Sequence, residues 1–177
     1  LDATVADLNT TLSDLLIFSR DFALHLDFCS LESLLDEISE EMQAVAAPRH
    51  VDVVYRREEG TAPLLLDRIK LKQALLNLLT NALEASPPTS RVEVLLHSQQ
   101  DTVQIAVKDQ GPGIPAADME QVFAPFFSTK ERGTGLGLPF AQKIVELHKG
   151  VLSVSNNPEG GATFLVEIPR RRPAQES

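Results

Sequence analysis

The hydrophobic positions of the first thirty residues recur every three or four places, which is typical of one face of a helix. The series runs from Leu1 to Leu26, and Ser19 occupies its one polar place. Four repeats fit either a coiled coil or an ordinary core-facing helix. No second helix of similar pattern adjoins this stripe before residue 30, so we expect a homodimer through residues 1–27.

The rest of the chain alternates between helical spacing and the two-residue spacing of strands. Helical spacing after the Ser30 N-cap, after Asp67 and after Leu138 predicts three helices, at about 31–47, 67–86 and 138–148. Alternating apolar residues predict strands at 51–57, 92–96, 103–107, 151–156 and 162–169. The pattern therefore predicts an α+β fold, a two-layer α/β sandwich. Its mixed, largely antiparallel sheet packs on helices and follows an N-terminal amphipathic helix.

One long segment, from Gln110 to Leu136, has no periodicity. Loops of this length within compact domains are uncommon and usually functional, so we expect a lid at about 110–137. It runs into "GTGLGL", residues 133–138, which opens the last predicted helix. Backbone N–H groups at such a turn can cradle a phosphate, although an ordinary flexible loop fits the same letters.

Composition and charge exclude some classes of function. A net charge of −9 argues against a nucleic-acid partner, and the "RRR" run at 170–172 is expected to be part of a solvated tail, 170–177. The single cysteine, Cys29, excludes an internal disulfide and suits a reducing compartment. No apolar run approaches the ~20 residues of a membrane span. We expect a cytoplasmic fragment of a longer protein, whether or not that parent is membrane-anchored.

Two asparagines stand out in the helix predicted after Asp67. Asn77 and Asn81 are four residues apart and share one helix face with Gln73, among leucines and alanines. Their amides either bond to neighbouring backbone groups or help to hold a hydrated Mg²⁺, which prefers oxygen ligands.

A carboxylate and two glycines stand where the strand at 103–107 ends. In "DQGPGI", Asp109 runs directly into a glycine turn. The segment is either a plain turn or a pocket in which the carboxylate accepts a hydrogen bond from an amine on a flat ring.

Taken in order, four segments resemble the ATP-binding catalytic domain of sensor histidine kinases, within the gyrase, chaperone, kinase and mismatch-repair ATPase superfamily. "NLLTNALEAS" resembles the N box, "DQGPGI" the first glycine box, "VFAPFF" the aromatic lid motif and "GTGLGL" the second glycine box. The resemblance covers about residues 30–169, and its wording is nearest to the nitrogen-regulator-like subgroup. Residues 1–29 would be part of a dimerisation hairpin, its second helix.

The resemblance implies a role for each matching residue. Asn77 and Asn81 would meet Mg²⁺ and the ATP phosphates, while Asp109 would bind the adenine amino group. The remaining implied nucleotide contacts are Gly111, Gly113, Lys130, Gly133, Thr134, Gly135, Leu136, Gly137 and, through water, Thr163, unless Ala162 takes that place. Lys130 is the cation nearest to the expected phosphates. Phe123, Phe126 and Phe127 would anchor the lid.

Three departures from the family pattern bear on mechanism. Glu84 and Ala85 stand where many such kinases carry a basic and an aromatic residue, so Lys130 is expected to supply the missing charge. Gln73 replaces the glutamate that activates water in related ATPases, so hydrolysis should be slow. None of the histidines (His25, His50, His97 and His148) has phosphoacceptor surroundings, and His148 is expected to be structural.

The function implied is transfer of the ATP γ-phosphate to a histidine of the full-length kinase, upstream of a response regulator. Two alternatives stay open: an ATPase of the superfamily, or a non-catalytic module regulated by nucleotide.

Overall fold

The computed structural model describes residues 23–58, 61–130 and 133–170. The helix and dimer expected of residues 1–22 and the tail beyond Arg170 lie outside this range. The helical stripe does not extend to Leu26 as expected, because residues 23–26 are irregular and β1 (Asp27–Cys29) follows. β1 pairs antiparallel with β3 (Leu64–Leu66), which sequence periodicity did not reveal. This pairing gives backbone groups of both segments hydrogen-bond partners, and Leu66 is buried, so a strand stands where a helix was expected.

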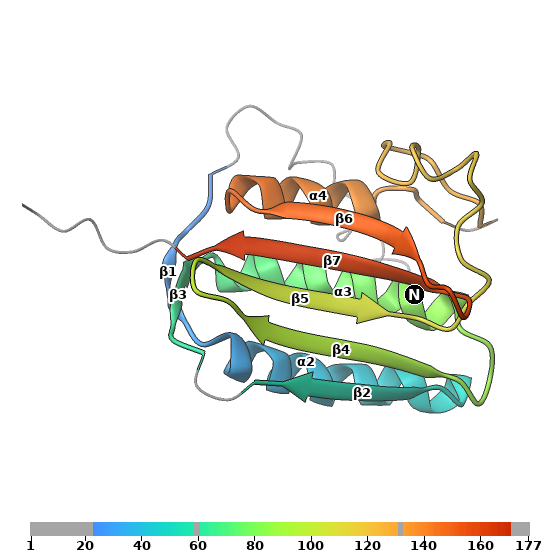
Figure 1. Ribbon diagram of the computed structural model, residues 1–177, viewed down its shortest axis with the longest axis horizontal. Coiled ribbons are helices and arrows are strands. Elements are labelled where there is room, and N and C mark those ends of the chain that lie inside the picture. Colours follow the sequence, from blue (N-terminus) through green and yellow to red (C-terminus); the bar gives the residue numbers. More distant parts are fainter. Residues whose placement is uncertain (1–22, 59–60, 131–132, 171–177) are drawn as a thin grey trace, which may run out of the picture.

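Five strands form the main sheet, in the spatial order β2-β4-β5-β7-β6 (Figure 1). They are β2 (Asp52–Arg57), β4 (Arg91–Ser98), β5 (Thr102–Lys108), β6 (Val151–Asn156) and β7 (Ala162–Pro169). β2 pairs parallel with β4, and every other pairing is antiparallel. The predicted mixed, largely antiparallel sheet is confirmed.

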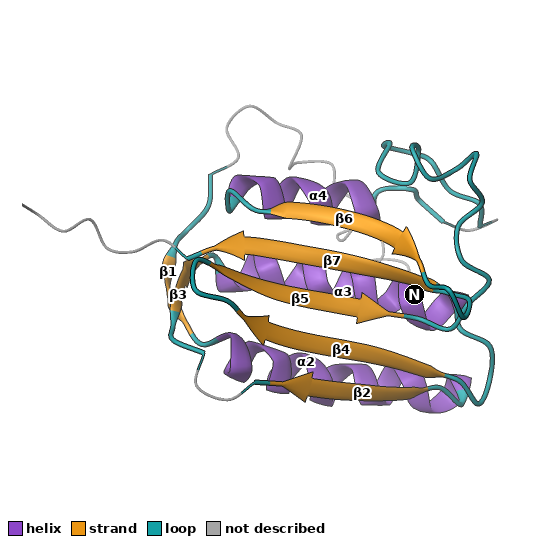
Figure 2. Ribbon diagram, in the orientation of Figure 1, coloured by secondary structure: helices purple, strands orange, loops and turns teal. Residues whose placement is uncertain are grey.

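Three helices lie on one side of this sheet, as Figure 2 shows. They are α2 (Leu31–Ala46), followed by the short 3-10 helix η1 (Ala47–Arg49), α3 (Arg68–Ala85) and α4 (Gly137–Leu147). The Ser30 and Asp67 side chains cap α2 and α3 by accepting from Ser33 N and Lys70 N. No helix in the described ranges is long and apolar enough to cross a membrane.

The hydrophobic core lies between the sheet and these helices. In β5, in β7 and in β4 as far as Leu96, every second residue is buried, and the residues between them face the opposite side of the sheet. Phe140 of α4 and Leu78 of α3 are fully buried in the same core. The predicted two-layer sandwich is therefore the observed fold.

A buried junction joins the start of α3 to the end of α4. The Asp67 N–H donates to Nε2 of His148 at 2.9 Å, so this ring nitrogen carries no proton. His148 Nδ1 therefore carries the proton and donates to Ile144 O at 2.8 Å. The Asp67 carboxylate also accepts from the backbone N–H of His25. His148 is thus a structural residue in its neutral form.

Candidate nucleotide-binding site

A cavity of about 440 Å³ lies beside the second half of α3. Its walls come from α3, the ends of β5 and β7, the loop at 110–136 and the start of α4. The predicted site residues that line it are Asn77, Asn81, Asp109, Gly113, Lys130, Gly133, Thr134, Gly135 and Gly137. The fold therefore gathers residues that are up to sixty positions apart in the sequence.

Asp109 lines the cavity and is 3% exposed. Its Oδ1 accepts from Gly111 N at 2.9 Å and from Ala162 N at 3.1 Å. Two backbone donors compensate the buried charge and fix the side chain. Because both of these bonds go to Oδ1, Oδ2 is the oxygen that can accept from a ligand amine.

Asn156, the last residue of β6, and Asn157, which follows it, hold the Asp109 segment in place. Asn156 accepts from Ile114 N through Oδ1 and donates to Ile114 O through Nδ2, both at 2.8 Å. Asn157 Nδ2 donates to Asp109 O at 3.2 Å. We call these contacts of Asn156 and Asn157 the asparagine brace. The sequence does not indicate it, because the pattern of "SNNPEGG" predicts only a connection between two strands.

Three predicted contacts do not line the cavity. Thr163 donates from Oγ1 to Asn157 Oδ1 at 2.6 Å, whereas its neighbour Ala162 is buried against the cavity. The adenine contact expected of Thr163 does not fit this geometry, because successive strand residues face opposite sides. Gly111 packs against the backbone of Ala85, and Leu136 is buried as the residue before α4.

The loop at 110–136 contains turns but neither helix nor strand in its described parts, as its lack of periodicity predicts. Phe123 anchors it by an edge-to-face contact with Phe164, with ring centroids 6.4 Å apart. Phe127 lines the cavity. Phe126 is 70% exposed, so the anchoring role expected of it is wrong. Its N–H instead donates to Gly135 O at 2.9 Å and ties the two arms of the loop together.

The two asparagines of α3 also line the cavity. Asn77 Nδ2 donates to Gly137 O at 3.3 Å, which ties α3 to the start of α4. Asn81 Oδ1 accepts from the Lys130 ammonium at 2.9 Å, so a cation already fits against this oxygen. The described residues contain no group of three or more His, Cys, Asp or Glu side chains that could hold a metal. The amide oxygens of Asn77 and Asn81, together with ligand phosphates, would form a donor set that suits Mg²⁺.

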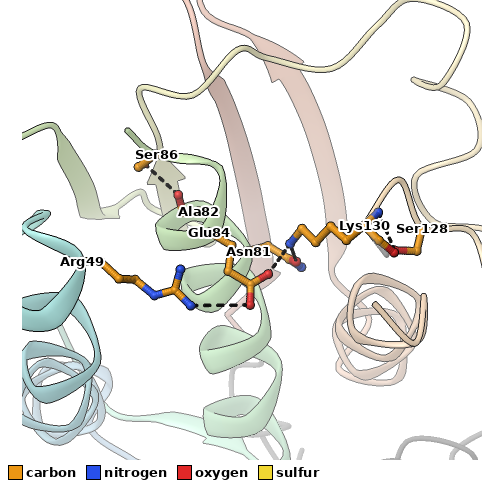
Figure 3. A network of polar contacts seen from close by, with 7 residues as sticks. All are labelled: Arg49, Asn81, Ala82, Glu84, Ser86, Ser128 and Lys130. Atoms are coloured by element: carbon orange, nitrogen blue, oxygen red, sulfur yellow. Dashed lines mark hydrogen bonds and ion pairs between the residues drawn. The ribbon is translucent and has the colours of Figure 1, made fainter. Parts of the chain in front are cut away.

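Figure 3 shows how Lys130 extends between two side chains of α3. Its ammonium contacts Glu84 Oε2 as well as Asn81 Oδ1. The other Glu84 oxygen, Oε1, lies 4.0 Å from the Arg49 guanidinium. From the sequence, Glu84 is notable only because it stands where many such kinases carry a basic residue. Its contact with Lys130, 46 positions away, cannot be predicted from the sequence.

Known proteins resemble this chain in sequence and in fold. Residues 66–172 match the model of the histidine kinase-, DNA gyrase B- and HSP90-like ATPase family. The catalytic domain of histidine kinase ThkA is 30% identical, with a TM-score of 0.77 over 83% of this chain and 97% of that one. ThkA in complex with the response regulator TrrA is 27% identical, with a TM-score of 0.81 over 96% of this chain and 49% of that one.

A longer relative has the same domain. The signal transduction histidine-protein kinase AtoS of Escherichia coli (strain K12) is 34% identical over 166 residues, which are 93% of this chain and 27% of AtoS. This chain thus spans about a quarter of that relative's length. It belongs to the histidine kinase-, DNA gyrase B- and HSP90-like ATPase family and is an ATP-binding catalytic domain of the sensor histidine kinase type.

Proposed function

We propose that this domain binds Mg·ATP in the cavity and presents the γ-phosphate to a histidine of its parent kinase. The observation that carries the proposal is the pairing of two features in one cavity. One is the buried Asp109, which accepts hydrogen bonds from two backbone N–H groups, and the other is Asn81 with Lys130. The first suits the amino group of adenine, and the second suits a metal-bound polyphosphate.

Each part of the cavity has a task in this proposal. Asp109 Oδ2 accepts from the adenine amine, while the 2.9 Å bond to Gly111 N holds the carboxylate still. Asn77 and Asn81 offer amide oxygens to Mg²⁺, and Lys130 meets a phosphate. Bound Mg²⁺ would neutralise charge on the phosphoryl oxygens. The protein's contribution is then position and charge, because phosphoryl transfer needs little covalent chemistry from the enzyme.

The acceptor in this proposal is a histidine outside the cavity. None of the four histidines of the chain lines it, and both ring nitrogens of His148 are engaged in the Asp67 junction. The downstream partner is a response regulator, which the ThkA–TrrA complex supports. A cytoplasmic location, a homodimer through residues 1–27 and membership of the nitrogen-regulator-like subgroup remain predictions.

Calorimetric titration with a non-hydrolysable ATP analogue, with and without Mg²⁺ and with GTP as comparison, tests binding. We expect Mg²⁺-assisted binding that prefers adenine. Asp109→Asn should abolish the preference and Asn81→Ala should weaken the Mg²⁺ effect. Asp52→Asn, at an exposed residue that does not line the cavity, should change neither. Full binding by both cavity variants would refute the assignment.

Transfer is tested by adding labelled ATP and a helical hairpin that carries the acceptor histidine. Acid-labile label on that hairpin supports the kinase. Rapid release of phosphate without a hairpin would instead favour the ATPase, although Gln73 offers no base for it. Tight binding without transfer would favour the non-catalytic module.

A further inference from the structure

Glu84 lies on the same face of α3 as Asn81, three residues later, and its side chain lines the nucleotide cavity. We propose that Glu84 is a positioning residue. It holds the Lys130 ammonium against Asn81 Oδ1 when no nucleotide is bound, and it thereby makes nucleotide binding depend on a divalent cation. This inference rests on the proposed function, because it concerns the same site.

The contacts place Lys130 between two acceptors of one helix. Its ammonium donates to Asn81 Oδ1 at 2.9 Å and contacts Glu84 Oε2 (Figure 3). Arg49, which does not line the cavity, faces the other Glu84 oxygen at 4.0 Å. Glu84 is therefore held between two cations, with its side chain 32% exposed. Either cation alone would leave the carboxylate freer to rotate away.

The charges along the cavity wall explain the consequence for ligands. Among the described lining residues, Lys130 is the only Lys or Arg, while Glu84, Asp109 and Asp118 are acidic. With Lys130 paired to Glu84, a metal-free polyphosphate meets a wall with no unpaired cation among these described residues. A phosphate must then compete with Glu84 for the ammonium, at a cost set by their mutual repulsion.

A divalent cation changes this balance in two ways. It lowers the negative charge of the nucleotide, so the repulsion from Glu84 falls. It also takes Asn81 Oδ1 as an oxygen ligand, a position that the Lys130 ammonium otherwise occupies. Release of Lys130 from Asn81 then leaves the ammonium available to a phosphate. The pair of Glu84 and Lys130 thus favours the metal complex over the bare nucleotide.

The test is a double-mutant cycle measured by calorimetry with a non-hydrolysable ATP analogue, in EDTA and in saturating Mg²⁺. The proteins are the unchanged chain, Glu84→Gln, Lys130→Gln and the double variant. Exposed ion pairs contribute up to ~1 kcal/mol. Glu84→Gln should therefore tighten metal-free binding about two- to fivefold. It should leave binding with Mg²⁺ within about twofold, and the tightening should disappear when Lys130 is also replaced.

Glu41→Gln is the matched control, because Glu41 forms an ion pair with Lys72 on the surface and does not line the cavity. It should leave both affinities unchanged. Thermal unfolding of each variant shows whether it is folded. The positioning role is supported only by a change in affinity for the ATP analogue in EDTA that is not seen in Mg²⁺.

Three results would overturn the inference while leaving the proposed function intact. If Glu84→Gln tightens metal-free binding equally in the unchanged chain and in Lys130→Gln, Glu84 acts only through long-range charge. If Glu84→Gln weakens binding in Mg²⁺ and not in EDTA, Glu84 contacts the metal instead of positioning Lys130. If Glu84→Gln leaves the affinity in EDTA unchanged, Glu84 has no role in the metal dependence of nucleotide binding. Failure of the unchanged chain to bind the analogue with Mg²⁺ would instead refute the proposed function itself, and the inference with it.

Discussion

Two adjacent glycines of the β6–β7 turn provide a matched test of how Asp109 is positioned in the cavity. Gly160 and Gly161 both have positive φ, +97° and +84°. A Cβ on Gly161 would lie 2.8 Å from the Asp109 carbonyl carbon and 3.0 Å from its Oδ1, and closer still to its carbonyl oxygen. A Cβ on Gly160 would have open space, with Gly111 O at 3.8 Å as its nearest neighbour.

The two alanine variants therefore share one cost and differ in another. Left-handed backbone costs an L-residue about 1–2 kcal/mol, and both Gly160→Ala and Gly161→Ala incur it. Overpacking adds typically 1–3 kcal/mol, and only Gly161→Ala incurs that. The expected loss of unfolding free energy is about 1–2 kcal/mol for Gly160→Ala and about 2–5 kcal/mol for Gly161→Ala.

Urea denaturation followed by circular dichroism measures the difference. With a slope of about 2 kcal/mol per molar urea, the midpoint of Gly161→Ala should lie about 1 M below that of Gly160→Ala. Adenine binding should fall in the same order, because the clash displaces the Asp109 carboxylate. Equal midpoints and equal nucleotide affinities for the two variants would refute the claim that close approach to Asp109 requires glycine at 161.

Three further predictions concern other parts of the molecule. Burial raises the pKa of Tyr55, the single tyrosine, to about 12 from its ordinary 10.0, so ultraviolet titration should give a midpoint near 12 when folded and about 10 in denaturant. Because the neutral phenol is favoured in the folded state, the raised pKa of Tyr55 adds to the free energy of unfolding. This contribution is complete below pH 10 and is lost as pH rises through 12. A titration midpoint near 10 in the folded protein would contradict the prediction. Phe140→Ala empties a fully buried site and should cost about 3–5 kcal/mol in denaturant unfolding, against less than about 0.5 for Ile69→Ala at an exposed position. Asn156→Ala removes both bonds to Ile114, so the Ile114 amide should exchange hydrogen faster and ATP-analogue affinity should drop; unchanged exchange would show that the brace is dispensable.

The sequence predicted the long elements well because local signals agree there. α3 has an Asp67 cap, an apolar stripe and a terminating pair of prolines, and the hairpin of β4 and β5 alternates cleanly. The short β1 and β3 could not be found this way. Each has three residues, and their pairing joins segments 37 positions apart. A run of leucines carries no period that distinguishes a strand from a loop.

The site was predictable where a family motif covers it, and not where tertiary contacts create it. Asp109, Asn77 and Asn81 line one cavity, as the resemblance implied. The brace of Asn156 on Ile114 spans 42 positions, and the link between Glu84 and Lys130 spans 46. Such pairs depend on how the loop returns to α3, which the spacing of residues does not encode. Ala162 and Thr163 could be told apart only once the strand register was known.

The junction at Asp67 has a mechanical meaning for the whole domain. Its carboxylate holds the backbone at His25, where the N-terminal segment enters, and caps the first turn of α3. Asn81 lies fourteen residues further along the same helix, roughly 20 Å away at 1.5 Å per residue. Hydrogen bonds to one carboxylate and a single uninterrupted helix therefore connect the backbone at His25 to Asn81 in the cavity wall. Because α3 is one helix, the spacing between its cap at Asp67 and its cavity side chains is fixed.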